Sequence, residues 1–212
     1  MYEIGTDGLQ QLLEEGRAAA AYAREHYGDF AARPHFYTLY GPSAHDIGAS
    51  VPTKIVPPAA RKLLKTTRRK NYFIYELDEN YRPLRTVHML DYVNPDCTFH
   101  HFELNGVHYA YPFRGRTGKL YSDKIYILKY AEGRPVYYGI AGSNLLFAQF
   151  LEYPEADKML VSTYRYFPTA KITMYGYPVD WNAPIGALNS PVDRHCQEEC
   201  PLFLEFSKWF TE

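Results

Sequence analysis

Residues 97–113 hold the densest group of side chains in the chain that can transfer a proton or bind a metal ion. Within this segment, Asn105 and Gly106 separate two runs in which apolar and polar residues alternate. Asn-Gly between such runs predicts a β-hairpin with a two-residue turn, because both central residues of that turn need a positive φ. This turn would place Glu103 opposite His108, with His101 diagonal to His108 on the same face.

The two faces of the predicted hairpin differ in character, because side chains alternate between the faces of a strand. We expect the core face to carry Phe102, Leu104, Val107, Tyr109 and Phe113, with His100 and Tyr111 at its far end. The opposite face carries His101, Glu103 and His108, our candidate catalytic residues, since a carboxylate beside an imidazole is typical of general-base sites. The alternative is a solvated Glu-His pair that only stabilises the hairpin, and a cavity on this face would favour catalysis.

Cysteines and histidines form two clusters that together could bind zinc, which prefers four Cys or His ligands in tetrahedral geometry. The predicted ligands are Cys97, His100, His195, Cys196 and Cys200. Against this site, adjacent histidines on a strand point to opposite faces, so only one of His100 and His101 could serve. Cysteines that are not ligands commonly act as small buried hydrophobes, which is the alternative here.

A basic segment precedes the predicted hairpins, in a stretch between Asp46 and Glu76 that contains no acidic residue. Its cations are Arg61, Lys62, Lys65, Arg68, Arg69 and Lys70. Lys and Arg neutralise phosphates while aromatic rings such as those that follow at Tyr72 and Phe73 can stack on bases. The segment therefore predicts a phosphate-binding or nucleic-acid-binding patch, with a solvated helix face as the alternative.

An amphipathic helix over residues 6–27 is the clearest element that could support these groups. Apolar residues recur there at helical spacing, while charged residues occupy the other side. Asp7 with Gln10 three residues later resembles a capping box, and Gly28 suits the position after the helix.

Most of the remaining chain is predicted to form strands, because it is rich in Val, Ile, Thr, Tyr and Phe between turn residues. The expected strands are residues 35–40, 72–77, 84–91, the two halves of 97–113, the two halves of 124–140, 158–167 and 171–177. Residues 145–153 and 202–210 fit helix and strand equally well. Residues 42–58 read as a long loop, and Ser190-Pro191 predicts the start of a short helix that carries His195, Cys196 and Cys200.

Together these elements predict one α+β domain over residues 1–212. A long N-terminal helix would pack on a mostly antiparallel, curved β-meander of about seven to nine strands, with a barrel-like closure as a variant. The 21 tyrosines among 212 residues favour sheet surfaces that are partly buried.

Charge and hydropathy exclude several classes of protein. The net charge of −1 gives no general attraction for a polyanion, so nucleic acid would have to bind through a local patch. No segment has the apolar length of a membrane span, and the N-terminus lacks the apolar core of a signal peptide. Three cysteines are an odd number that does not suggest a disulfide framework, so we expect a cytoplasmic protein without a membrane partner.

Two functions stay open at this stage. The first is a non-enzymatic binding protein that presents a Tyr-rich sheet surface to a protein or small-molecule ligand. Such a protein could cover a sheet edge by forming a homo-oligomer. The alternative is an enzyme for a phosphate-bearing or nucleic-acid substrate, which would use the basic segment for binding and His101, Glu103 and His108 for chemistry. Histidines that line one deep pocket with the basic segment would favour the enzyme.

Overall fold

The computed structural model describes residues 4–41, 72–80, 82–90, 95–132, 134–155, 158–167, 172–174, 177–179 and 193–198. The helices are α1 (Thr6–Glu25) and α2 (Tyr27–Ala32). The strands are β1 (Tyr37–Gly41), β2 (Tyr72–Leu77), β3 (Pro83–Met89), β4 (Pro95–Leu104), β5 (Val107–Arg114), β6 (Ile125–Ala131), β7 (Arg134–Ala141), β8 (Leu146–Glu155), β9 (Lys158–Tyr166), β10 (Ile172–Met174), β11 (Tyr177–Val179) and β12 (Asp193–Glu198). The predicted α+β class, a helix on an antiparallel sheet, is confirmed.

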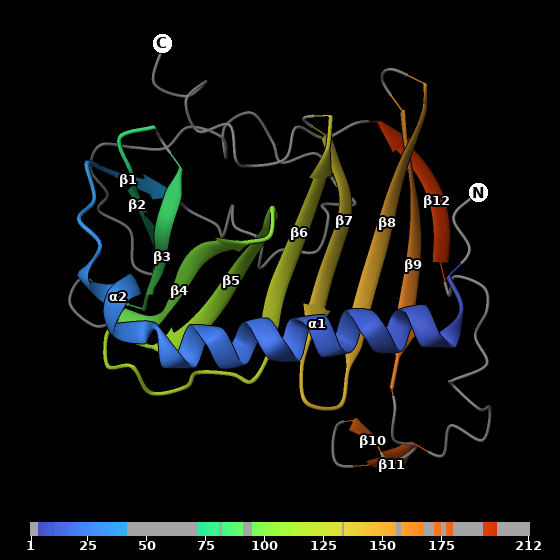
Figure 1. Ribbon diagram of the computed structural model, residues 1–212, viewed down its shortest axis with the longest axis horizontal. Coiled ribbons are helices and arrows are strands. Elements are labelled where there is room, and N and C mark those ends of the chain that lie inside the picture. The colour runs from blue at the N-terminus through green and yellow to red at the C-terminus, as the bar shows by residue number, and fades with distance from the viewer. Residues whose placement is uncertain are drawn as a thin grey trace.

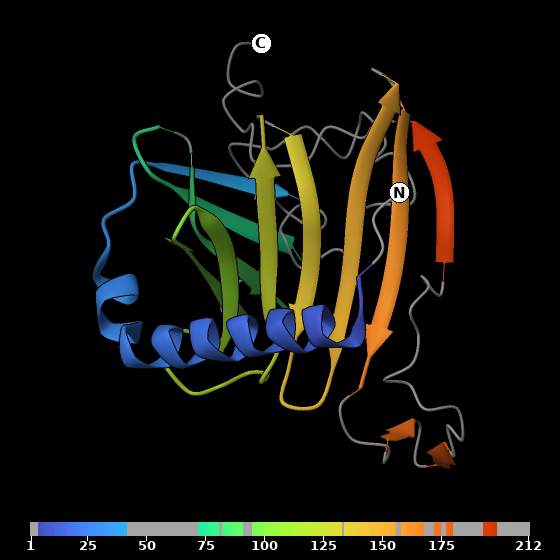
Figure 2. The ribbon, with the colours of Figure 1, turned by 45° about the vertical axis from the view of Figure 1, so that its right-hand side comes forward.

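The main sheet is an antiparallel meander that α1 crosses (Figure 1). Its order is β1-β2-β3-β4-β5-β6-β7-β8-β9-β12, so strands that follow one another in the chain are neighbours throughout β1 to β9. Figure 2 shows the curvature of this sheet from a second direction. The barrel-like variant is not confirmed, because the order of the described strands ends in β1 on one side and β12 on the other.

One face of α1 packs on the sheet, as the periodicity predicts. Leu9, Leu13, Ala20 and Ala23 are buried with residues of β5 to β8 in one hydrophobic core. The helix ends differ from the prediction. Gly5 precedes the first turn and no side chain caps it, and Gly28 lies inside α2 because the chain starts a second short helix directly after His26.

Close packing between α1 and the sheet depends on Gly16. A Cβ atom added to Gly16 would overlap Ala141 Cβ and lie 3.2 Å from Ile127 Cδ1. We expect Gly16→Ala to lower the free energy of unfolding by about 1–3 kcal/mol, since this steric overlap outweighs the better helix propensity of alanine. Urea unfolding followed by circular dichroism would measure the change.

Gly28→Ala is the matched control, because no atom lies within 4 Å of the position of its added Cβ. This change in α2 should leave stability equal or raise it by up to about 1 kcal/mol. Equal effects of the two substitutions would contradict the close approach of α1 to the sheet.

Several local predictions are corrected by strand pairing. Residues 193–198 form β12 beside β9 and not a short helix, because backbone pairing along six residues outweighs the local Ser-Pro signal. Residues 145–153, for which helix and strand were both open, contribute to β8. Residues 171–177 are not one strand but supply parts of the short pair β10 and β11. The predictions for residues 42–58, 61–70 and 202–210 lie outside the described residues.

Half of the tyrosines whose exposure is described are buried, and nearly all of the others are half-buried. The buried ones are Tyr72, Tyr75, Tyr109, Tyr111, Tyr137, Tyr138, Tyr164 and Tyr166. Tyr121 is 44% exposed. Much of the described tyrosine content that suggested a binding surface therefore serves to pack both sides of the sheet. Among the described helices, none is both long and apolar enough to span a membrane.

Candidate ligand-binding site

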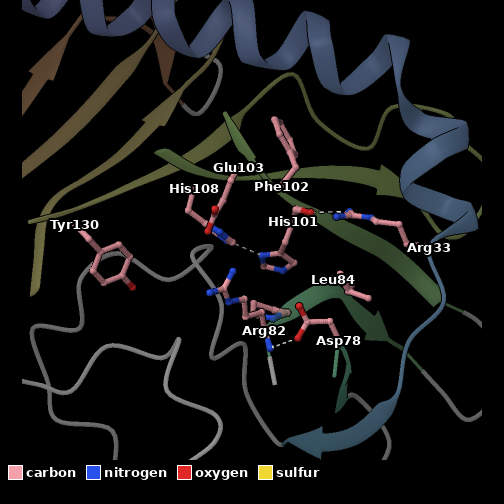
Figure 3. Close-up of a pocket in the computed structure, with 10 residues that line it drawn as sticks. Arg33, Asp78, Arg82, Leu84, His101, Phe102, Glu103, His108 and Tyr130 are labelled. Carbon is pink, nitrogen blue, oxygen red and sulfur yellow. Dashed lines mark hydrogen bonds between the residues drawn. The ribbon is translucent and has the colours of Figure 1, made fainter. Parts of the chain in front are cut away.

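A pocket of about 430 Å³ opens on the face of the sheet that lies away from α1 (Figure 3). It is formed by the β2–β3 turn, by β3 to β6 and by the segment that follows α2. Its polar lining is Arg33, Asp78, Arg82, His101, Glu103 and His108, and its apolar lining is Pro83, Leu84, Phe102 and Tyr130.

The β4–β5 hairpin positions the histidines in this pocket. Asn105 and Gly106 have φ angles of 51° and 74°, as the predicted turn requires. The predicted register is confirmed, with Glu103 opposite His108 and Phe102 opposite Tyr109. Because neighbouring residues face opposite sides, Phe102 and Tyr109 join the core beneath α1, while His108 belongs to the pocket.

The two pocket histidines are joined in a hydrogen-bonded chain that reaches β3. His101 Nδ1 lies 3.2 Å from His108 Nε2, and His101 Nε2 lies 2.8 Å from Thr86 Oγ1. Only one of the two facing imidazole nitrogens can donate when both rings are neutral, so the chain has a direction. Exchange of tautomers and rotation of the threonine hydroxyl would reverse that direction and move a proton along the chain.

Burial keeps both pocket histidines neutral at pH 7. Desolvation, with a contribution from the Arg33 charge, lowers the pKa of His108 to about 4. Desolvation and the neighbouring His108 hold the pKa of His101 well below its ordinary value. A ligand in the pocket therefore meets hydrogen-bonding imidazoles and not imidazolium cations.

Arg33 brings a positive charge to the inner side of the pocket. Its Nη2 donates to the backbone carbonyl of His101 over 2.6 Å, while its Nε has no hydrogen-bond partner among the described residues. Burial and the neighbouring Arg85 lower the pKa of Arg33, although a guanidinium stays protonated near neutral pH. Buried charges are normally paired, so this cation favours an anion beside it.

The second cation, Arg82, and the carboxylate of Asp78 lie in the β2–β3 turn. Asp78 Oδ1 accepts hydrogen bonds of 2.8 Å from the backbone N–H groups of Asn80 and Arg82. This is a local turn arrangement that fixes the backbone and occupies one carboxylate oxygen. The Arg82 side chain is exposed at the pocket (Figure 3), where it could contact a ligand from the solvent side.

Comparison of the chain with protein families, curated proteins and solved structures finds no match.

The candidate catalytic residues are all found at the pocket, but their mutual arrangement differs from the expected one. His108 is hydrogen-bonded to His101, whereas Glu103 is exposed and no hydrogen bond joins it to either histidine among the described contacts. A cavity on this face of the hairpin was the feature that would favour catalysis, and the pocket is such a cavity. The strands bring together His101, His108 and Thr86. They do not place a carboxylate where it would orient either histidine.

The predicted zinc ligands are not brought together in the described part of the chain. Cys97 packs with Phe99 and Leu128, whereas His100 contacts Tyr27 and Phe113 beneath the helices. The two side chains are therefore on opposite faces of β4. His195 and Cys196 belong to β12, which five strands separate from β4 in the sheet, and Cys200 lies outside the described residues.

The basic residues Arg61, Lys62, Lys65, Arg68, Arg69 and Lys70 also lie outside the described residues. Phosphate or nucleic-acid binding by this segment stays a prediction. The positive charges of the described pocket come instead from Arg33 and Arg82, which the sequence did not single out.

Two important site residues carry weak signals in the sequence. Arg33 follows a six-residue helix whose position on β4 depends on tertiary contacts. Thr86 lies within an expected strand, and its partner His101 lies on the next strand along the sheet. Pairing the two predicted strands in register would have brought Thr86 close to His101, but the strand register was predicted only for the Asn-Gly hairpin.

Proposed function

We propose that this protein binds a small molecule in which a carboxylate or phosphate group is attached to an apolar part. The observation that carries the proposal is the partly buried Arg33 guanidinium, which lines the pocket and has no carboxylate partner among the described residues. An anion in the pocket beside the Arg33 guanidinium would compensate its charge, which is the common way in which proteins bind carboxylates and phosphates.

The size and lining of the pocket support a small ligand. Its volume of about 430 Å³ falls in the usual range for small-molecule sites. Pro83, Leu84 and Tyr130 offer an apolar wall for the uncharged part of the ligand. The neutral imidazoles of His101 and His108 add directional hydrogen bonds without adding charge.

The protein is still proposed to bind a ligand, but the binding site is the pocket and not an open Tyr-rich surface of the sheet. An open Tyr-rich surface is less well supported, because half of the tyrosines whose exposure is described are buried and Tyr130 is the tyrosine that lines the pocket. Cytoplasmic location and homo-oligomer formation remain predictions from the sequence.

A second function, acid–base catalysis on the same kind of anionic substrate, is favoured by one observation. The Thr86–His101–His108 chain can accept a proton at the pocket and pass it inward by a change of tautomer. Chemistry would then depend on His108, while anion binding would depend on Arg33. Substitutions of His108 and of Arg33 would therefore distinguish catalysis from binding.

Phenyl phosphate and benzoate are suitable probes, with benzyl alcohol as the uncharged analogue. We expect both anions to bind, and Arg33→Gln to weaken their binding by roughly 10- to 100-fold, the size expected for losing a hydrogen bond to a charged group. Chemical-shift titration of the ¹⁵N-labelled protein would give the affinities and show whether residues of the pocket respond.

Arg114→Gln is the matched control, since Arg114 is an exposed arginine of β5 that does not line the pocket. The affinity of the Arg114→Gln variant for the anions should stay within about twofold of that of the unchanged protein. The proposal would be wrong if neither anion bound, if benzyl alcohol bound equally well, or if Arg33→Gln and Arg114→Gln had the same effect.

A further inference from the structure

Three potential metal ligands meet on β3 and β4, away from the ligand-binding pocket. They are His88, Asp96 and Cys97, whose ligand atoms all lie within 4.8 Å of one another. Of the zinc ligands expected from the sequence, this group contains only Cys97. It forms because of an irregularity in the pairing of the two strands.

A β-bulge places two consecutive residues opposite one. His88 pairs with Cys97 and Met89 pairs with Pro95, so Asp96 is the additional residue on β4. In a regular strand, Asp96 and Cys97 would point to opposite faces of the sheet. A bulge redirects one side chain, and here it brings the carboxylate of Asp96 to the same side as the thiol of Cys97.

Neighbouring groups hold the ligands in place. The His88 ring stacks on Phe73 with a centroid distance of 4.7 Å, and the Tyr121 hydroxyl donates to Asp96 Oδ2 over 3.0 Å. Ligands of metal sites are commonly oriented by such outer contacts. The Asp96 carboxylate therefore has a fixed position toward His88, because a hydrogen bond of 3.2 Å joins His88 Nδ1 and Asp96 Oδ2. A metal ion bound by both atoms would take the place of the proton that they share.

The spacing of these atoms suits tetrahedral coordination. Ligand atoms at normal bond lengths from one tetrahedral zinc ion lie about 3.3–3.7 Å apart. The His88–Asp96 distance of 3.2 Å is close to this range, and the limit of 4.8 Å for the whole group requires only small side-chain movements. Rotation about side-chain bonds would be sufficient to move Cys97 Sγ closer to the ligand atoms of His88 and Asp96.

We propose that His88, Asp96 and Cys97 bind one divalent transition-metal ion of the zinc class. A thiolate and an imidazole favour such a metal over Mg²⁺ or Ca²⁺, which prefer oxygen ligands. Three protein ligands leave one position for water or another exchangeable ligand. The side chains of His88 and Asp96 are 20% and 24% exposed, so that position can be reached from solvent, whereas Cys97 closes the inner side.

Cobalt(II) is the appropriate probe, because a Co²⁺–thiolate bond gives a charge-transfer absorption and tetrahedral Co²⁺ absorbs in the visible range. The full chain, purified without metal and kept reduced, should bind one Co²⁺, and Zn²⁺ should displace it. We expect Cys97→Ala to abolish the charge-transfer band and Asp96→Asn to weaken Co²⁺ binding by at least about tenfold. Because Asp96 is partly exposed, Asp96→Asn also tests the site if Cys97→Ala does not fold.

The double variant Cys196→Ala/Cys200→Ala is the control for the other two cysteines of the chain. It should retain the charge-transfer band and the affinity for Co²⁺. Absence of near-stoichiometric Co²⁺ binding would overturn the proposal. So would loss of the band in this double variant together with an unchanged band in Cys97→Ala, and so would unchanged affinity in Asp96→Asn.

Discussion

Lowering the pH from 7 to 5 is expected to destabilise the fold by roughly 4–6 kcal/mol, because three buried histidines resist protonation. Desolvation lowers the pKa of His100 to about 3 and that of His108 to about 4, and it holds the pKa of His101 well below its ordinary value. A loss of this size is comparable to the whole stability of many domains. We therefore expect the protein to unfold near pH 5.

The direction follows from the protons bound by each state. Below the ordinary histidine pKa of about 6.5, the unfolded chain takes up protons that the folded chain does not. The stability is therefore complete above about pH 6.5, and it is lost as the pH falls toward the lowered pKa values of the folded state. Each histidine contributes up to about 1.4 kcal/mol per pH unit in that window.

Urea unfolding at a series of pH values between 7 and 5 would measure this dependence. His108→Gln keeps a polar side chain but removes one of the three titrating groups, so the slope of stability against pH should fall by about one third. Equal stability of the unchanged protein at pH 7 and pH 5 would contradict the burial of these imidazoles.

The second large effect is expected at Glu76, a buried carboxylate between two arginines. Arg85 Nε donates to Glu76 Oε2, and Arg116 Nη2 donates to Glu76 Oε1 over 2.8 Å. Burial alone would raise the pKa of Glu76, but the hydrogen bonds from both arginines outweigh it and lower this pKa. Glu76 is therefore ionised in the folded protein at neutral pH.

Glu76→Gln should lower the free energy of unfolding by about 3–5 kcal/mol, because it leaves the buried Arg85 guanidinium without its carboxylate. Arg85 Nη1 also donates to the carbonyls of Phe30 and Arg33, at 3.1 Å and 3.0 Å. Losing its carboxylate partner should therefore disturb the end of α2 as well as β2 and β3. Chemical denaturation would give the stability, and amide exchange at residues 27–33 would show the local change.

Arg116→Ala provides the control on the same carboxylate. The Arg116 side chain is 55% exposed, and exposed ion pairs typically contribute about 0–1 kcal/mol. A small effect of Arg116→Ala beside a large effect of Glu76→Gln is the expected pattern. Similar effects would mean that the buried Arg85 does not depend on Glu76.

The sequence was most informative where the structure depends on neighbouring residues. Asn105–Gly106 determines both the turn and the register of β4 and β5, so the positions of His101 and His108 could be predicted. The helical spacing of Leu9 and Leu13 likewise predicted the buried face of α1.

Features that depend on distant segments could not be obtained in this way. Arg33 reaches the pocket only through the placement of α2, and Asp96 joins Cys97 only through a bulge that no local pattern announces. The local Ser-Pro signal suggested a helix around His195, but pairing with β9 made that segment a strand. The metal ligands that we propose consequently differ from the set predicted from the sequence, and Cys97 is the residue that both sets share.

The alternation along β4 means that folding and recognition can be altered separately by neighbouring substitutions. His100 and Phe102 pack beneath the helices, while His101 faces the pocket and Cys97 faces the side of His88. Mutational scanning of this strand should therefore show two interleaved profiles. Changes at His100 and Phe102 should reduce only the amount of folded protein, whereas changes at His101 and Cys97 should in addition lower the ligand or metal affinity of the protein that folds.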